Sequence, residues 1–330
     1  MASSRVTFYA AMAANVAIAL TKVGAAAWSH SSAMLAEAIH SIVDTGDGAL
    51  MLVGTALARR PPDQAHPFGH GKELYFWTLI VGMLVFSVGG GVSTYEGIAR
   101  IQHPREAIGW QLNLVVIGAA AAFESGSFAI AWRHYRDYRR EHGGEGGLFE
   151  AFHRTKDPAA FVVVLEDGAA LIGLAFAAAG VTLGHLLGSA VYDGAASVAI
   201  GLVLATVATL LAYETRGLLI GESAMRGVVR SIRNRAEQTP GLARLNRVLT
   251  MHLGPHELLV ALDVAFEPSL SAPELNRAAG CLERTIRDVD AAIKHVYLDL
   301  HALAPAEARA AAAAGDEDPA STELPAPAPV

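Results

Sequence analysis

The chain has 330 residues, of which 52% are hydrophobic and only 17% are charged, and its formal net charge is −7. The apolar residues come in long blocks, which excludes an ordinary soluble protein and predicts an integral, multi-pass membrane protein. The single cysteine, Cys281, excludes a disulfide within the chain and a metal site built from several thiolates.

Six segments are apolar over about 20 residues or more, the length that a helix needs to cross a bilayer. They are Val6–Trp28, Ala33–Ala58, Leu74–Ile98, Leu112–Trp132, Ala159–Leu183 and Ser189–Tyr213. The first continues through Lys22 and is too long for the apolar core of a signal peptide, so we expect it to span the membrane. Gly89, Gly90 and Gly91 of the third permit close packing and sliding of neighbouring helices.

Basic residues in the connecting loops predict the orientation of the bundle. They concentrate after the second and the fourth segments, at Arg59, Arg60, Lys72, Arg133, Arg136, Arg139, Arg140, Arg154 and Lys156. Even-numbered spans should therefore end in the cytoplasm, with both termini on that side. The expected location is a bacterial inner membrane.

The composition changes after Tyr213, and a small α+β domain is expected there. Strands are predicted at Arg244–Leu253, Leu258–Glu267 and His295–His301, and a helix at Ser271–Asp288. In the second strand, Val260, Leu262, Val264 and Phe266 alternate to one side. This order suits a ferredoxin-like domain with an antiparallel sheet. We predict a transport domain over 1–213, a cytoplasmic domain over 214–304 and a disordered tail over 305–330, which is rich in Ala, Pro and Glu.

A polar stripe on the second segment carries the strongest functional signal. Glu37, His40, Asp44 and Asp47 are spaced three, four and three apart, so all four share one face of a helix. Ionisable groups at bilayer depth are costly and mark ion pathways. His40 and Asp44 are one turn apart and could hold one ion. An imidazole with a carboxylate suits zinc and, less selectively, other divalent ions. Glu37 or Asp47 could instead lie near an interface and be solvated.

The fifth segment carries adjacent acids, Glu166 and Asp167, which point about 100° apart on a helix. One can face an ion while the other faces a neighbouring helix or water. The alternative is that one of these two acids forms an ion pair within the membrane. We expect no Lys or Arg in the middle of a span to provide that partner. Glu124 on the fourth segment could be a proton carrier, a ligand or a hydrogen-bonding group in helix packing.

Two further groups of residues could bind metal outside the bundle. Asp63, His66 and His70 are spaced three and four apart in a turn-rich loop, where the alternative is a solvated histidine loop. In the C-terminal domain, His252, His256, Asp299 and His301 form a weaker candidate, because Asp299 and His301 alternate on one strand.

Two motifs carry a resemblance to a known family. The stretches SSAMLAEAIHSIVDTGD and HPFGHGKELY, with six spans and a small C-terminal domain, resemble the cation diffusion facilitator family over about residues 5–303. The stretch VVLEDGAALIG is similar to the branch that includes the eukaryotic mitochondrial zinc transporter. The resemblance implies exchange of a divalent metal, usually zinc, for protons, and a homodimer.

The resemblance also implies a ligand set. The family's membrane site uses a [HD]xxxD pair on the second span, matched by His40 and Asp44, and another on the fifth, where Asp167 matches but Val163 cannot bind metal. Glu166 is then the candidate replacement, and a more oxygen-rich site favours Mn²⁺ or Fe²⁺. Asp63, His66 and His70 match the family's surface site. In the C-terminal domain, family ligand positions including Leu262 are apolar.

The expected function is a divalent-metal transporter that exports zinc from the cytoplasm in exchange for protons. Its partners would be the metal ion, protons, lipid and a second copy of the chain, with no prosthetic group and no nucleic acid; Co²⁺, Mn²⁺ and Fe²⁺ are alternative cargoes. The rival interpretations are chiefly manganese or iron transport, a membrane metal sensor that does not transport, and a membrane metalloenzyme. We expect that the protein is not an enzyme, because its sequence contains no HExxH or comparable motif.

Overall fold

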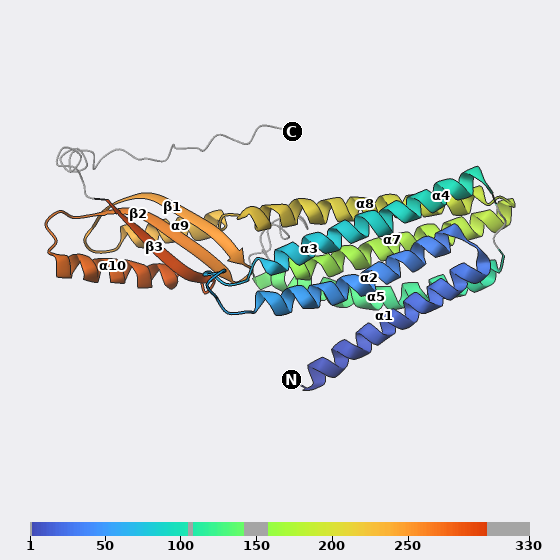
Figure 1. Cartoon of the computed structure of the whole chain (residues 1–330), viewed down its shortest axis with the longest axis horizontal. Coiled ribbons are helices and arrows are strands. Elements are labelled where there is room, and N and C mark those ends of the chain that lie inside the picture. The colour runs from blue at the N-terminus through green and yellow to red at the C-terminus, as the bar shows by residue number, and fades with distance from the viewer. Residues whose placement is uncertain (1, 105–107, 142–157, 302–330) are drawn as a thin grey trace. The chain divides into compact units, whose positions relative to one another are not determined.

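The computed structural model describes residues 2–104, 108–141 and 158–301 (Figure 1). The chain divides into two compact units. One comprises residues 1–222 with 252–257, and the other comprises residues 223–251 with 258–330. The expected tail from residue 305 lies outside the described residues.

The first unit is built from long helices (Figure 1). They are α1 (Ala2–Ser29), α2 (Ser32–Ala58), α3 (Glu73–Leu84), α4 (Ser93–Gln102), α5 (Trp110–Glu141), α7 (Pro158–Leu187) and α8 (Val191–Ile220). A π-helical segment, η1 (Val85–Val92), joins α3 to α4. All six segments that were expected to span the membrane are therefore helical, and α8 continues past the expected end at Tyr213.

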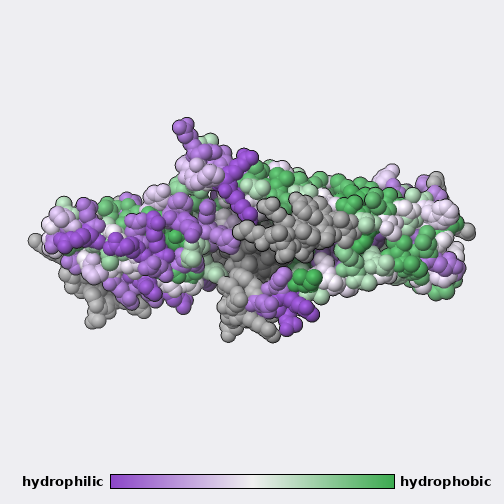
Figure 2. All heavy atoms as spheres, turned by 90° about the horizontal axis from the view of Figure 1, so that it is seen from below, coloured by the Kyte–Doolittle hydropathy of each residue, from purple (hydrophilic) through white to green (hydrophobic). Residues whose placement is uncertain are grey.

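Within the described residues, four helical segments are long and apolar enough to cross a membrane. They are Glu73–Gln102, Trp110–Asp137, Val162–Leu187 and Val191–Ile220. Hydrophobic side chains cover much of the face of this unit that Figure 2 shows. A helical membrane protein is thereby confirmed, whereas the total of six spans stays a prediction.

Glycines bring the η1–α4 segment into backbone contact with α8. A methyl group added at Gly97 would lie 2.6 Å from the Gly194 carbonyl oxygen, and one added at Gly201 would lie 2.8 Å from that of Gly90. Such close approach is typical of helices that pack through small residues in lipid. The expected packing role is confirmed for Gly90, which is buried, but not for Gly91, which is exposed.

The second unit is a small α+β fold. It contains α9 (Arg226–Glu237), most of β1 (Leu242–Gly254) and of β2 (Glu257–Phe266), α10 (Ala272–Arg287) and β3 (Ile293–His301). Ser271 and Glu274 form a capping box at the start of α10, as a Ser-x-x-Glu pattern predicts. The alternation expected in β2 is confirmed, because its buried side chains pack with those of α9 and α10 in one hydrophobic core.

The sheet differs from the expected antiparallel arrangement. Its strand order is β1-β2-β3, and β2 pairs with β3 in parallel. Helix α10 makes the crossover that a parallel pair requires, while only two residues separate β1 from β2, which permits an antiparallel hairpin. The fully antiparallel sheet was therefore wrong for β2 and β3, and the ferredoxin-like description is not confirmed.

Candidate metal centre

Helix α2 turns its polar stripe into the interior of the bundle. Glu37 is fully buried, and His40 and Asp47 are each 1% exposed. Asp44 lies one turn after His40, and its Oδ1 is 3.5 Å from His40 Nδ1. The spacing therefore did identify one shared face, and the suggestion that Glu37 or Asp47 is solvated at an interface was wrong.

A cavity of about 300 Å³ joins the stripe to α5 and α7. Its polar lining consists of Asn15, Ser41, Asp44, Asp47, Thr55, Glu124, Ser127, Glu166 and Asp167. Both adjacent acids of α7 reach this cavity despite pointing in different directions along the helix. Helix α5 contributes Glu124, and its Ser127 hydroxyl donates to Asp167 Oδ2 at 2.7 Å. No sequence pattern indicated a role for Ser127.

Several buried polar atoms of the cavity lining, and of His40, which precedes the lining residue Ser41 on α2, have no hydrogen-bond partner among the described residues. They are both ring nitrogens of His40, Asp44 Oδ1, both carboxylate oxygens of Asp47 and Glu166 Oε1. Leaving such a group unsatisfied costs about 1–3 kcal/mol, and more for a charged group. Imidazole nitrogens and carboxylate oxygens are ligands for zinc and related divalent ions. The donor set therefore fits a divalent cation or protons.

Glu37 has a different partner from the rest of the stripe. The Lys22 ammonium on α1 is buried and lies 3.1 Å from Glu37 Oε2, and it also donates to Ser41 Oγ at 2.8 Å. The expected lack of a basic partner concerned the acids of α7; the buried Lys22 pairs with Glu37 instead. Lys22 was visible in the sequence as the one basic residue inside the first predicted span.

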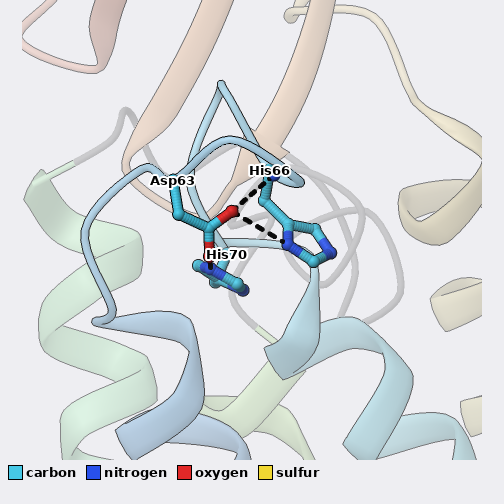
Figure 3. Close-up of side chains that lie close together, drawn as sticks. All are labelled: Asp63, His66 and His70. Atoms are coloured by element: carbon cyan, nitrogen blue, oxygen red, sulfur yellow. Dashed lines mark hydrogen bonds and ion pairs between the residues drawn. The ribbon is translucent and has the colours of Figure 1, made fainter.

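The loop between α2 and α3 brings its three expected ligands together (Figure 3). One ligand atom from each of Asp63, His66 and His70 lies within 4.8 Å of the others. His70 Nε2 is 3.1 Å from Asp63 Oδ2, and the His66 backbone N–H donates to Asp63 Oδ1 at 2.7 Å. The hydrogen bond from the His66 backbone holds the pKa of the Asp63 carboxyl below its ordinary value. The His70 side chain and the Ala65 backbone N–H contribute in the same direction.

Family comparison places these sites in context. A family model described as the cation efflux transmembrane domain matches residues 8–220. The chain belongs to the cation diffusion facilitator family. The residues that the family model matches include the α2 stripe, the acids of α7 and the loop cluster.

Individual relatives agree with this membership. The cation diffusion facilitator described here is 30% identical over 239 residues to the mitochondrial proton-coupled zinc antiporter SLC30A9 of Xenopus laevis, covering 72% of this chain and 42% of that protein. It is 32% identical over 212 residues to metal tolerance protein C4 of Arabidopsis thaliana, covering 63% and 46%. An uncharacterized transporter of Methanocaldococcus jannaschii is 21% identical over 285 residues, covering 86% and 94%. The chain thus matches less than half the length of the first two relatives.

Val163 of this cation diffusion facilitator occupies the position where the resemblance predicted a second ligand on the fifth span. The side chain lines the cavity one turn before Asp167, where the family pair would place a ligand. Glu166 lies in the same cavity with an unpartnered oxygen. The geometry is therefore compatible with Glu166 as the replacement. Among the described residues, however, only the loop brings three His, Asp or Glu ligand atoms within 4.8 Å of one another.

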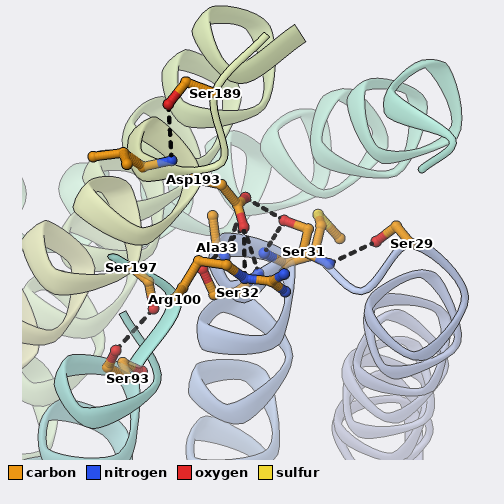
Figure 4. A network of polar contacts seen from close by, with 11 residues as sticks. Ser29, Ser31, Ser32, Ala33, Ser93, Arg100, Ser189, Asp193 and Ser197 are labelled. Carbon is orange, nitrogen blue, oxygen red and sulfur yellow. Dashed lines mark hydrogen bonds and ion pairs between the residues drawn. The ribbon is translucent and has the colours of Figure 1, made fainter. Parts of the chain in front are cut away.

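A second polar centre, which sequence reasoning missed, anchors the start of α2 (Figure 4). Asp193 of α8 is buried and accepts hydrogen bonds from the Ser31 hydroxyl and from the Ser32 backbone N–H and hydroxyl, the last two at 2.6 and 2.9 Å. Arg100 Nε lies 3.9 Å from the same carboxylate. A carboxylate is favoured at a helix N-terminus, where backbone N–H groups are unpaired. This contact fixes the position of the helix that carries His40 and Asp44.

The weaker candidate in the C-terminal part of the chain gains no support. The side chain of His301 lies outside the described ones, and the remaining candidates, His252, His256 and Asp299, do not form a ligand cluster within the described residues. Val260, Leu262 and Val264 are fully buried in the core of the sheet unit. An apolar residue at the Leu262 position is thus explained by packing.

Proposed function

We propose that the chain is a metal/proton antiporter that moves a divalent cation, zinc in the first place, out of the cytoplasm. The observation that carries this proposal is the set of buried, unpartnered ligand atoms on α2 and α7 around one cavity. His40, Asp44, Glu166 and Asp167 would bind the ion. The cation efflux domain and the zinc antiporters among its relatives support this assignment.

The mechanism follows from competition between metal and protons for the same atoms. Carboxylates and imidazole must lose their protons to bind a metal, so binding releases protons and protonation displaces the metal. Alternating access of the cavity to the two sides of the membrane would then couple the two flows. The carboxylates supply the negative charge that offsets desolvation of a divalent ion.

Zinc is proposed as the main cargo on two grounds. His40 provides an imidazole ligand, which suits zinc, and the SLC30A9 relatives are named zinc antiporters. The valine at position 163 removes a ligand and leaves a site richer in oxygen, which favours manganese or iron in comparison with a family-like set. A strong preference for Mn²⁺ or Fe²⁺ over Zn²⁺ would therefore point to the alternative cargo.

The proposal extends to membrane topology and assembly. Six spans would enclose the pathway, with both termini in the cytoplasm of a bacterial cell, because the loops after the second and fourth spans are the most basic. The C-terminal unit would support a homodimer. The loop cluster of Asp63, His66 and His70 would bind a metal at the cytoplasmic surface.

Flux through purified protein in liposomes tests this function. Uptake of Zn²⁺ should be saturable and should be inhibited by Co²⁺ more strongly than by Mg²⁺, because imidazole is a ligand that Mg²⁺ does not favour. Competition with Mn²⁺ and Fe²⁺ in the same assay ranks the alternative cargoes. Tight Zn²⁺ binding without any flux would contradict transport and favour a membrane metal sensor.

A further inference from the structure

Lys22 and Glu37 form an ion pair with almost no exposure in the interior of the bundle. The side chains are 1% and 0% exposed, and the Lys22 ammonium lies 3.1 Å from Glu37 Oε2. A lysine ammonium donates three hydrogen bonds and accepts none, so it cannot be a metal ligand. A positive charge buried beside a cation pathway requires a reason other than binding the ion.

The pair lies at one end of the metal cavity. Along α2 the cavity lining begins at Ser41 and continues to Thr55, a length of about 21 Å at 1.5 Å per residue. The Lys22 ammonium donates to the Ser41 hydroxyl at 2.8 Å, and Glu37 lies one turn before Ser41, outside the lining. The cavity therefore ends where the ion pair begins.

Helix α7 completes this closure. A methyl group added at Gly173 would collide with Glu37 Oε1, so the carboxylate rests directly on the backbone of α7. Three helices, α1, α2 and α7, thus meet at the pair. A cation that moved from His40 and Asp44 along α2 toward the start of the helix would pass the Lys22 ammonium.

The two charges act on a cation in opposite directions. The Lys22 ammonium repels a divalent ion at Asp44, whereas the Glu37 carboxylate attracts it, and both interactions are strong in a medium of low dielectric constant. A buried ion pair alone is weak evidence for a stabilising role, because desolvation offsets most of its attraction. The two charges are therefore expected to change the affinity of the cavity for cations and the movement of cations along α2.

Resting on the proposed function, we propose that Lys22 and Glu37 are a positioning pair that closes this end of the cavity and sets its affinity for divalent cations. The ammonium excludes cations from the first turns of α2. The Glu37 carboxylate holds the ammonium in place and balances its charge. Movement of metal past this point then requires α1, α2 and α7 to rearrange together.

Opposite effects of two single substitutions test this role. In Lys22→Met the Glu37 charge remains alone, so the Kd for Zn²⁺ should fall by about tenfold. In Glu37→Gln the ammonium remains alone, so the Kd should rise by about tenfold. The neighbouring, exposed Thr21 bonds only to its own helix at Ala17, which makes Thr21→Val a matched control with unchanged affinity. Shifts in the same direction, or no shift in either variant, would overturn the proposal.

The double variant Lys22→Met/Glu37→Gln keeps the test decisive if a single variant does not fold, because it buries no unpaired charge. Loaded liposomes at equal pH on both sides should lose Zn²⁺ about fivefold faster with the double variant than with the unmodified chain, since the charged barrier is gone. An unchanged leak would show that the pair only braces the helices. Failure of the unmodified chain to bind or move Zn²⁺ would instead reject the proposed function itself.

Discussion

The two candidate metal sites differ in how far the protein satisfies its own ligand atoms. In the bundle, buried oxygens and nitrogens of the α2 and α7 ligands have no hydrogen-bond partner among the described residues. In the loop, Asp63 is exposed and already accepts backbone hydrogen bonds from Ala65 and His66. An unsatisfied buried polar group costs about 1–3 kcal/mol. Binding of a cation or a proton therefore lowers the free energy of the bundle far more than that of the loop.

This difference indicates where transport resides. A site that moves an ion has to be unstable when it is both empty and deprotonated, so that either metal or protons must fill it. The bundle meets that condition, and the loop does not. Substitutions in the bundle should therefore have large effects on flux, and substitutions in the loop small ones.

The largest effect is expected from Asp44→Ala. This change removes a carboxylate that faces both His40 and the cavity, so Zn²⁺ uptake into liposomes should fall to near background. Thr45→Val is the matched control, because the Thr45 hydroxyl bonds only to the Ser41 carbonyl of its own helix. A folded Asp44→Ala protein that transports normally would show that the membrane site is wrongly placed.

A tenfold effect is expected at Glu166. If its unpartnered oxygen binds metal, Glu166→Gln should weaken Zn²⁺ affinity about tenfold, or 1.4 kcal/mol, and change the order of metal preference. Val163→His should add an imidazole and shift preference toward zinc over manganese. Calorimetric titration of both variants with Zn²⁺ and Mn²⁺ measures this. Unchanged affinity and selectivity in Glu166→Gln would leave the site with three side chains and water or Glu124.

A smaller effect is expected from Ser127→Ala. The Ser127 hydroxyl donates to Asp167 and so favours its ionised, metal-binding form. Loss of one hydrogen bond of about 1 kcal/mol should weaken Zn²⁺ binding about fivefold and leave the fold intact. Ser87→Ala removes an exposed hydroxyl that donates to the Met83 backbone carbonyl and serves as the control. Equal Zn²⁺ affinities of Ser127→Ala and the control would place Asp167 outside the ligand set.

The smallest effect on flux is expected in the loop. His70→Ala should change Zn²⁺ uptake by no more than about twofold, as for other surface substitutions, while it removes metal binding at the loop. The part of the Zn²⁺ binding that His70→Ala removes from an Asp44→Ala protein reports on the loop. Loss of transport in His70→Ala would erase the contrast between the two sites.

The pH dependence of loop binding has a definite sign. The pKa of Asp63 is lowered, so its carboxylate stays ionised as the pH falls through the ordinary aspartate pKa of about 3.9. Any contribution of this lowered pKa to the stability of the fold is lost as the pH falls further, through the pKa of the folded state. Proton competition should therefore come from the imidazoles of His66 and His70, which must be neutral to bind a metal. Zn²⁺ binding by the Asp44→Ala protein should weaken in mild acid, before the Asp63 carboxylate is protonated; binding that persists to about pH 4, near the ordinary aspartate pKa, would exclude the histidines as ligands.

Local patterns predicted much of this architecture. Apolar length placed the helices, and the spacing of Glu37, His40, Asp44 and Asp47 predicted one buried face, because both signals arise within a single helix. The partners of that face could not be predicted in the same way. Lys22 pairs with Glu37 across α1 and α2, and Asp193 holds the start of α2 from another helix, 161 residues away in the case of Ser32. Such contacts depend on packing, which spacing alone does not encode.

The parallel pairing of β2 with β3 shows the same limit in the second unit. Strand periodicity correctly placed Val260, Leu262 and Val264 in the core. Strand direction depends on how the chain returns to the sheet, and α10 makes that return as a crossover. The side of each strand was therefore predictable, whereas its neighbour's direction was not.

Simultaneous recording of zinc and proton movement shows whether the two flows are coupled. Liposomes containing the purified chain would carry a Zn²⁺-sensitive dye and a pH-sensitive dye, and Zn²⁺ would be added outside. Zn²⁺ entry should be accompanied by proton exit, collapsing the pH gradient should slow both, and Asp44→Ala should abolish both. Zn²⁺ entry without proton movement, unaffected by pH between about 5.5 and 8 around the histidine reference value, would contradict antiport and indicate a channel.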